Sequence, residues 1–364
     1  MNSQTGNNSK EGSEDMPANR LDRGKRVTID QVAAQAGVSK TTVSRFLNGR
    51  YDALSDDTEQ RIRHVIQELN YRPNRLAQSL KAQNSRMLGC VVSDISSPFS
   101  AIIVKGINSV CVEAGYQLLL VESGDDPKRE REAIRDLLEN QVDGLIVNTT
   151  GGNDEFLLDL GGQGIPLVLA DRCLSAPGLL DTVATESYHI TYECVAMLHD
   201  MGYQHVGFFT QGNGSVAPRI LRYQGFCDSM RLHYHQDGEE FLYEFDINDT
   251  ASGVRQLSAF CDRFPGERLA AFVVNGVTML HLLQAIRADG IEIGAQFGVC
   301  GFDDWGWADL IPPGITTINQ TSHLVGRRSA ELLLARIAGH GPEKPVYEEL
   351  ANHLTIRGST VKGD

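Results

Sequence analysis

Apolar and polar positions follow two different patterns along the chain. Residues 27–69 repeat apolar positions at helical spacing, whereas from residue 87 short apolar runs alternate with helix-length amphipathic segments. Residues 1–26 are polar and charged with almost nothing to bury, which predicts a disordered tail. We therefore expect an all-α domain over 27–73, a linker over 74–86 and an α/β domain over 87–360.

The apolar spacing over residues 28–48 predicts two short helices around a tight turn. Thr28 and Ser39 are suitable N-caps, and Gly37 can take the positive φ at which the first helix ends. The start and outer face of the second helix stay polar, as in a helix that enters the major groove of DNA. This is the plan of a helix-turn-helix, although an ordinary helical hairpin has the same spacing. The residues expected at DNA are Thr28, Ser39, Lys40, Thr41, Thr42, Ser44, Arg45 and Asn48.

A third helix is predicted after the cap Ser55-Asp-Asp-Thr, and Pro73 separates it from a last short helix over 74–81. This block, together with the Ala-x-x-Ala-Gly-Val-Ser of the helix-turn-helix, resembles the lactose-repressor (LacI/GalR) family of bacterial transcription regulators. The resemblance implies a hinge helix in the minor groove, with Leu80 wedged between base pairs. Packing of Leu76 and Leu80 onto the core domain is the alternative. The hinge residues implied at DNA are Asn74, Arg75, Ala77, Leu80 and Lys81.

Charge divides the chain in the same way. Residues 1–86 contain 14 Lys and Arg against 10 Asp and Glu, a net charge of +4, whereas the whole chain has a net charge of −14. A basic head on an acidic body is typical of a protein that touches phosphate only with its head.

From residue 87 onward, buried strands are expected to alternate with helices. Such alternation predicts parallel sheets covered on both faces, and its restart near 186–205 predicts two similar lobes. The expected strands are 87–93, 115–122, 142–147, 165–170, 205–210, 269–275 and 297–303. The expected helices are 99–114, 126–140, 188–201, 219–232 and 277–288.

The body carries further markers of the family, including Val142-Asp-Gly-Leu-Ile, Gly301-Phe-Asp-Asp and Pro312-Pro-Gly-Ile-Thr-Thr-Ile. The resemblance implies a periplasmic-binding-protein-like body of two lobes joined by three crossovers, with a small effector between them. It assigns 87–184 and 321–345 to the first lobe, and 185–320 and 346–360 to the second. It also implies a homodimer on a pseudo-palindromic operator, although the sequence does not show whether the effector releases or recruits the repressor.

The resemblance also places effector-binding residues at the strand ends. They are Asp94, Phe99, Asp171, Arg219, Arg222, Asn275, Asp303, Trp305 and Gln320. Carboxylates and amides suit the hydroxyls of a polyol, arginine suits an anion, and an aromatic ring covers an apolar sugar face. Gly276 stands where the family often has Asp. Alternatives remain open: Asp171 and Asp303 as loop caps, Phe99 as core, Arg222 in an inter-lobe salt bridge, and one tryptophan in packing.

Arg219 and Arg222 lie one helical turn apart, and two guanidiniums favour a sugar acid over a neutral sugar, with a purine as a further alternative. If Arg219 is instead exposed to solvent, the sequence no longer favours a sugar acid over a neutral sugar.

The chain lacks the sequence motifs of common enzyme classes. It has no Gly-x-x-x-x-Gly-Lys, Gly-x-Ser-x-Gly or His-Glu-x-x-His, and the glycines at 151–152 and 161–164 are expected in loops. The seven scattered cysteines include no Cys-x-x-Cys pair, and no signal peptide is evident. We therefore expect a cytoplasmic regulator, associated with the nucleoid through its operator, that is not an enzyme and needs no cofactor or metal. A sugar-binding module without DNA function is the alternative.

Overall fold

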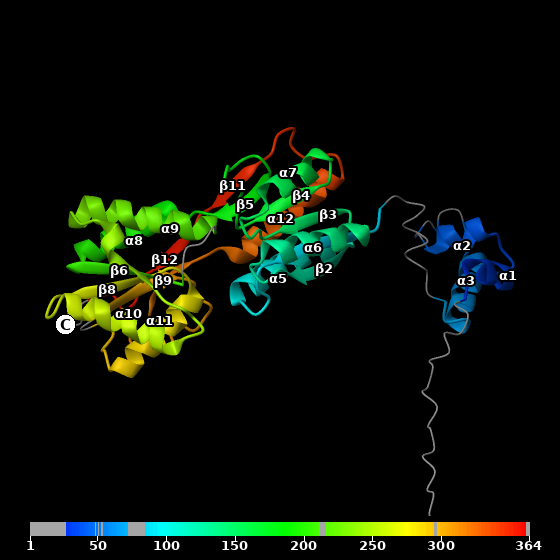
Figure 1. The fold of residues 1–364 in the computed structure, drawn as a ribbon. Helices are drawn as coiled ribbons and strands as arrows, with labels where there is room; N and C mark the ends of the chain where they lie inside the picture. The colour runs from blue at the N-terminus through cyan, green and yellow to red at the C-terminus, as the bar shows by residue number, and fades with distance from the viewer. Residues whose placement is uncertain are drawn as a thin grey trace, which may run out of the picture. The chain divides into compact units, whose positions relative to one another are not determined.

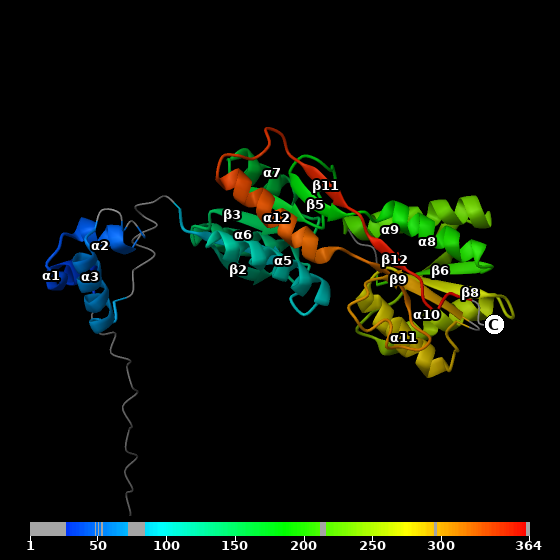
Figure 2. The same ribbon diagram turned by 180° about the vertical axis from the view of Figure 1, so that it is seen from behind.

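The computed structural model describes two units separately (Figures 1 and 2). The first unit is Met1–Gln83 and the second is Asn84–Asp364. The described residues are 27–47, 49, 51, 54–71, 84–211, 216–294 and 297–361.

The described part of the first unit contains three short helices around a small apolar core. They are α1 (Ile29–Ala36), α2 (Lys40–Leu47) and α3 (Asp56–Glu68). The side chains of Val32, Val43 and Ile62, one from each helix, are fully buried together. Gly37 ends α1 at φ 64°, in the left-handed region that glycine adopts without a Cβ clash. The turn between α1 and α2 makes a helix-turn-helix, as predicted.

The second unit begins with a six-stranded parallel sheet, which we call lobe 1. Its order is β11-β5-β4-β3-β1-β2. One face is covered by α5 (Pro98–Ala114) and α12 (Ser322–Ile337), and the other by α6 (Pro127–Glu139) and α7 (Asp154–Gly162). The strands are β1 (Met87–Val92), β2 (Gln117–Glu122), β3 (Gly144–Val147), β4 (Leu167–Ala170), β5 (Asp181–Thr185) and β11 (Tyr347–Leu350).

Lobe 2 repeats the plan with the order β12-β10-β9-β8-β6-β7. Its last strand is antiparallel to β10, and one large apolar cluster forms its core. The strands are β6 (His205–Thr210), β7 (Leu242–Glu244), β8 (Leu269–Val273), β9 (Phe297–Phe302), β10 (Thr316–Asn319) and β12 (His353–Thr355). The helices are α8 (Tyr188–Asp200), α9 (Ala217–Ser229), α10 (Thr250–Arg263) and α11 (Gly276–Asp289), with a π-helical turn at Met230–Tyr234 and a 3₁₀ turn at Gly238–Phe241.

Two glycines let α5 and α12 approach each other closely. These helices lie side by side on lobe 1 in both views, α5 in cyan and α12 in orange (Figures 1 and 2). A Cβ on Gly106 would lie 2.2 Å from the carbonyl oxygen of His323, and one on Gly326 would lie 2.1 Å from that of Ile103. No side chain fits at either position without separating the two backbones.

The topology confirms the α/β lobes and the three crossovers, which follow β5, β10 and β11. It also corrects two expectations. Tyr347–Leu350 pairs with β5 in lobe 1, so the segment 346–360 does not belong wholly to lobe 2. Gly161 and Gly162 lie in the last turn of α7 rather than in a loop. No helix in the described ranges is long and apolar enough to cross a membrane.

Candidate functional site

Helix α2 presents the predicted DNA-contact residues on its outer side. Ser39, Lys40, Thr41 and Arg45 are exposed, and Thr42 and Ser44 are half-buried. The amide of Thr42 donates to the Ser39 hydroxyl at 3.1 Å, which confirms Ser39 as the cap. The Lys40 ammonium lies 2.9 Å from the Asp30 carboxylate, and both are more than half exposed. Such a pair contributes little, so a DNA phosphate can compete for the lysine.

Thr28 has a structural role beside its predicted one. Its amide donates to the Gln31 side chain at 2.8 Å, and the Gln31 amide donates to the Thr28 hydroxyl at 3.4 Å, which completes a capping box. The other predicted DNA contacts lie outside the described residues. They are Asn48, Asn74, Arg75, Ala77, Leu80 and Lys81.

Polar side chains from both lobes meet beyond the carboxyl ends of the strands. The Thr185 hydroxyl, at the end of β5 in lobe 1, donates to the amide oxygen of Gln320, which follows β10 in lobe 2, at 3.2 Å. In each lobe the parallel strands end at one edge of the sheet, and residues distant in sequence gather there. We call the group in which residues of the two lobes meet the polar cluster, and its members are Asp171, Arg172, Arg219, Arg222, Asp303 and Gln320.

Arg222, on α9, is a buried cation of the polar cluster. Its Nη1 donates to the Val274 carbonyl oxygen at 2.8 Å, and its Nη2 donates to Gln320 Oε1 at 2.8 Å. The guanidinium also lies 3.6 Å from the ring centroid of Phe302, a cation–π contact. Burial lowers the pKa of Arg222 to about 10, although the charge of Asp303 opposes the shift. Carbonyl, amide and ring therefore hold this arginine in one orientation.

Asp303 accepts hydrogen bonds on both carboxylate oxygens. The Gly276 amide donates to Oδ2 at 2.8 Å, and Gln320 Nε2 donates to Oδ1 at 2.7 Å. Its backbone has φ 76°, uncommon for a residue with a Cβ. Burial raises the pKa of Asp303, and the charge of Arg222 opposes that rise. Gln320 thus joins the buried carboxylate to the buried guanidinium.

Asp171 follows β4 and faces this pair from lobe 1. It also has a positive φ, 68°, and is 6% exposed. Burial raises its pKa to about 6, while the charges of Arg222 and Arg172 pull the pKa downward. No described residue hydrogen-bonds to the buried Oδ1 of Asp171. A ligand hydroxyl is the kind of donor that this oxygen lacks.

Arg172 is a candidate site residue that was not predicted from the sequence. It is 8% exposed, and its Nη1 lies 2.6 Å from the Asp125 carboxylate and donates to the Thr149 carbonyl oxygen at 3.2 Å. Its Nη2 donates to the Ser93 hydroxyl at 3.3 Å. These partners follow β2, β3 and β1. Its position next to Asp171, directly after β4, could have pointed to it. The neighbouring sequence, however, does not show that the side chain turns inward.

Arg219 lies one turn before Arg222 on α9 and is half-buried. Burial and the charge of Arg172 lower its pKa, and the charges of Asp125 and Asp171 act in the opposite direction. The guanidinium is therefore within reach of the charges of lobe 1. The polar cluster contains three arginines from two lobes, two of which were predicted.

Three predicted residues have local structural roles. Asp94 accepts from the amide and hydroxyl of Ser96, at 2.8 and 2.6 Å, and so forms the turn before α5. Phe99 packs against the core of lobe 1, and Asn275 caps α11 by accepting from the Thr278 amide at 2.9 Å. Phe99 is half-buried against this core, so its role at an effector stays a prediction.

Trp305 occupies the space that a side chain at position 276 would need. A Cβ on Gly276 would lie 2.6 Å from the Trp305 ring and 2.9 Å from the Asp303 Cβ. The glycine found where the family often has Asp therefore allows the indole to lie beside Asp303. Trp307 instead packs against the core of lobe 2.

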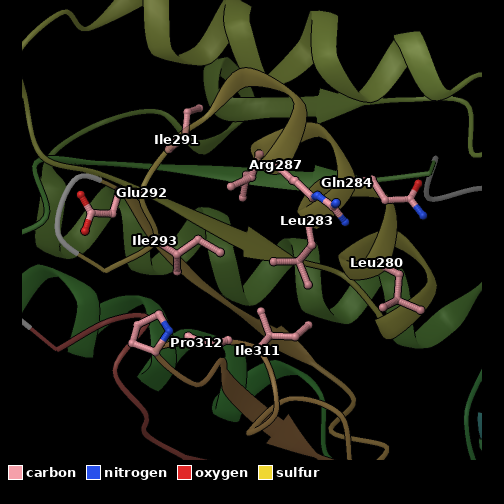
Figure 3. Close-up of a pocket in the computed structure, with 11 residues that line it drawn as sticks. Leu280, Leu283, Gln284, Arg287, Ile291, Glu292, Ile293, Ile311 and Pro312 are labelled. Atoms are coloured by element: carbon pink, nitrogen blue, oxygen red, sulfur yellow. The ribbon is translucent and has the colours of Figure 1, made fainter.

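A separate pocket of about 740 Å³ lies on lobe 2, between α11 and residues 311–313. Leu283, Ile293 and Ile311 line it (Figure 3). It includes none of the predicted effector residues, and its mainly apolar lining does not suit a polyol.

Comparisons with known proteins agree with this architecture. Residues 28–74 match the family described as bacterial regulatory proteins, lacI family, and residues 195–360 match the periplasmic binding protein-like domain. The HTH-type transcriptional regulator KdgR of Bacillus subtilis is 40% identical over 313 residues, 86% of this chain and 91% of its own length. The regulator PtxS of Pseudomonas putida is 33% identical over 348 residues, 95% of this chain and 98% of its own. The solved lac repressor dimer, bound to operator and the anti-inducer ONPF, has a TM-score of 0.80 at 27% identity and covers 93% of this chain and 100% of its own.

Proposed function

The chain belongs to the lacI family of bacterial regulatory proteins, and on that premise we propose that it is a repressor controlled by a sugar acid. The effector binds at the polar cluster, between Asp171, Arg172, Arg219, Arg222 and Asp303. The observation that carries the proposal is the meeting of three arginines from two lobes beside two buried carboxylates.

The guanidiniums of the polar cluster favour an anion over a neutral sugar. Asp125 is already paired with Arg172, and Arg219 and Arg222 lie beside Asp171 and Asp303, so the preference rests on the donor geometry of the guanidiniums and not on an excess of positive charge. A guanidinium presents a planar pair of donors that matches a carboxylate. The unsatisfied Oδ1 of Asp171 can accept from a hydroxyl of the same molecule.

A matched pair of ligands tests the proposal. D-gluconate and D-glucitol share the same carbon chain and differ only in the carboxylate. We expect gluconate, or its 2-keto acid, to raise the unfolding temperature of the protein at concentrations at which glucitol has no effect, because only a ligand of the folded state stabilises it. Arg219→Gln should abolish most of the gluconate shift, whereas Arg255→Gln, at an exposed position of α10, should retain it. Equal shifts of the unfolding temperature with both ligands would contradict the proposal that the effector is an anion.

DNA recognition follows from the same premise. The lac repressor relative is a dimer bound to operator. We propose a homodimer here too, with α2 of each subunit in the major groove of one half-site and Leu80 of each hinge at the operator centre. Such a repressor acts in the cytoplasm and at the nucleoid, where the DNA is. Titration of operator with and without gluconate measures whether the effector releases or recruits the protein.

The apolar pocket on lobe 2 is our candidate for part of the dimer interface. Leu280 on its rim is 40% exposed, and the pocket opens between α11 and Ile311. Exposed apolar surface of this kind is typical of a face that a second subunit covers.

A further inference from the structure

Asp143 holds the place where the chain enters lobe 1. The amide and hydroxyl of Ser85 donate to its Oδ1 at 2.7 and 2.8 Å, and the amide of Arg86 donates to its Oδ2 at 2.9 Å. The Asp143 amide in turn donates to the Met87 carbonyl oxygen at 2.8 Å. One carboxylate thus accepts three hydrogen bonds from the two residues that precede β1.

The backbone at this entry point is strained and is held from a second side. Arg86 has φ 56°, a left-handed conformation that is unfavourable for a residue with a Cβ. Its carbonyl oxygen accepts from the Gln117 amide at 2.8 Å. Its guanidinium donates to the Ala114 carbonyl oxygen at 3.3 Å and lies 5.2 Å from the Tyr116 ring centroid. Such a strained turn persists only because these contacts with its neighbours hold it in place. We call Ser85, Arg86 and Asp143 the entry joint.

The strands that start at the entry joint end at the polar cluster. β1 and β3 are paired in parallel from Leu88↔Gly144 to Val91↔Val147. Ser93 follows β1 and Thr149 follows β3, and both contact the Arg172 guanidinium. At roughly 3.3 Å per residue, these strands place the joint about 20 Å from the cluster. Two paired strands in the centre of a covered sheet are stiff, so lobe 1 moves as one body between joint and cluster.

We propose that Asp143 is a positioning residue for the allosteric response: it fixes the backbone of Ser85 and Arg86, through which the chain connects the DNA-binding unit to lobe 1. This inference rests on the proposed function. When the effector shifts the lobes between two arrangements, the motion reaches the DNA-binding unit only if the backbone does not rotate freely at Ser85 and Arg86. The hydrogen bonds to the Asp143 carboxylate prevent that rotation. Loss of the joint therefore uncouples two sites whose own contacts remain intact.

The test compares coupling with binding in the full-length protein. Operator affinity is measured with and without saturating gluconate or 2-keto-gluconate, on a duplex that the wild type selects from random sequence. The affinity of the same acid is measured separately by titration calorimetry. The variants are Asp143→Ala, which removes all three bonds, and Asp143→Asn, which keeps an acceptor for Ser85 but faces the Arg86 amide with a second donor. Asp136→Ala, at an exposed position of α6 in the same lobe, is the matched control.

We expect acid affinity within about threefold of wild type in both Asp143 variants. For each protein we take the factor by which the acid changes operator affinity. This factor should be at least about fivefold smaller in Asp143→Ala than in wild type, and intermediate in Asp143→Asn, within the usual range of coupling. An effect of the acid that is unchanged in Asp143→Ala overturns the inference. A parallel loss of acid affinity also overturns it, because it would show that Asp143 only stabilises the structure of lobe 1. A wild-type factor of one with both acids counts against the proposed function itself.

Discussion

Replacement of Asp171 by Asn is expected to stabilise the ligand-free protein at neutral pH. The carboxylate is 6% exposed, and burial raises its pKa from the ordinary 3.8 to about 6. Between these two pH values the folded state therefore keeps a proton that the unfolded state has already released. A raised folded-state pKa means that the stability contributed by this group is complete below pH 3.8 and is lost as the pH rises through about 6. Asn has no charge to bury and tolerates the same positive φ.

The pKa difference sets the size of the effect. At about 1.4 kcal/mol per pKa unit, a rise from 3.8 to about 6 corresponds to roughly 3 kcal/mol of lost stability at pH 7.5. At pH 4.5 the same two pKa values give about 1 kcal/mol. The gain from Asp171→Asn should therefore be about 2 kcal/mol larger at pH 7.5 than at pH 4.5.

Urea unfolding at the two pH values provides the assay. Circular dichroism follows the helices of both lobes, and fluorescence follows Trp305 and Trp307 in lobe 2, so coincident curves establish that the lobes unfold together. Asp136→Asn, at an exposed aspartate of α6, is the matched control for the substitution itself. The Asp171→Asn protein should also bind gluconate more weakly, because one acceptor is lost.

Two outcomes would refute this reasoning. A gain from Asp171→Asn that is equal at both pH values would show that Asp171 does not titrate between them. A loss of stability at pH 7.5 would show that attraction to Arg172 and Arg222 outweighs the burial of the charge.

Two further substitutions test the packing of the site and of the fold. Gly276→Asp should displace the Trp305 ring, whose nearest atom lies 2.6 Å from the position of the new Cβ, and should bring a third carboxylate to the polar cluster. We expect gluconate affinity to fall at least about tenfold, and Trp305 emission to change in a Trp307→Phe background. Gly106→Ala should separate α5 from α12 and lower the free energy of unfolding by about 2 kcal/mol, measured as a lower urea midpoint; Gly162→Ala, where nothing lies within 4 Å of the new Cβ, should cost nothing.

The sequence could predict residues whose place follows from strand order. Asp171 and Asp303 each come directly after a buried strand, and Gln320 follows another. Because neighbouring parallel strands of a sheet end together, Asp303 and Gln320 had to approach one another once the sheet of lobe 2 was recognised. Asp171 follows a strand of the other sheet, so its approach to them depends on how the two lobes face each other. Arg222 could be found from the family motif, and the structure brings it to Gln320 as expected.

Other residues could not be assigned because their roles depend on contacts between distant segments. Arg172 turns inward because Asp125 and Thr149, on two other loops, receive its guanidinium. The strand β11 has two consecutive glutamates and little apolar pattern, so only its pairing with β5 places it in lobe 1. For Asp94 the role at an effector stays a prediction, because the structure shows it accepting from Ser96, two residues away. An aspartate after a strand fits a local turn as well as a ligand site.

The backbone of the polar cluster and its neighbour Trp305 indicates how the free energy of effector binding can be used. Asp171, Asp303 and Trp305 all have positive φ values, and none is a glycine. Both carboxylates are buried with raised pKa values, and one oxygen of Asp171 has no hydrogen-bond donor among the described residues. A simple loop cap at Asp171 would satisfy both of its oxygens, as Asp303 does. A site that is costly without its ligand gains free energy when a polyol supplies the missing donor. If that donor reaches Asp171 only in one arrangement of the lobes, the same hydrogen bond selects that arrangement, which is the differential binding that allosteric control requires.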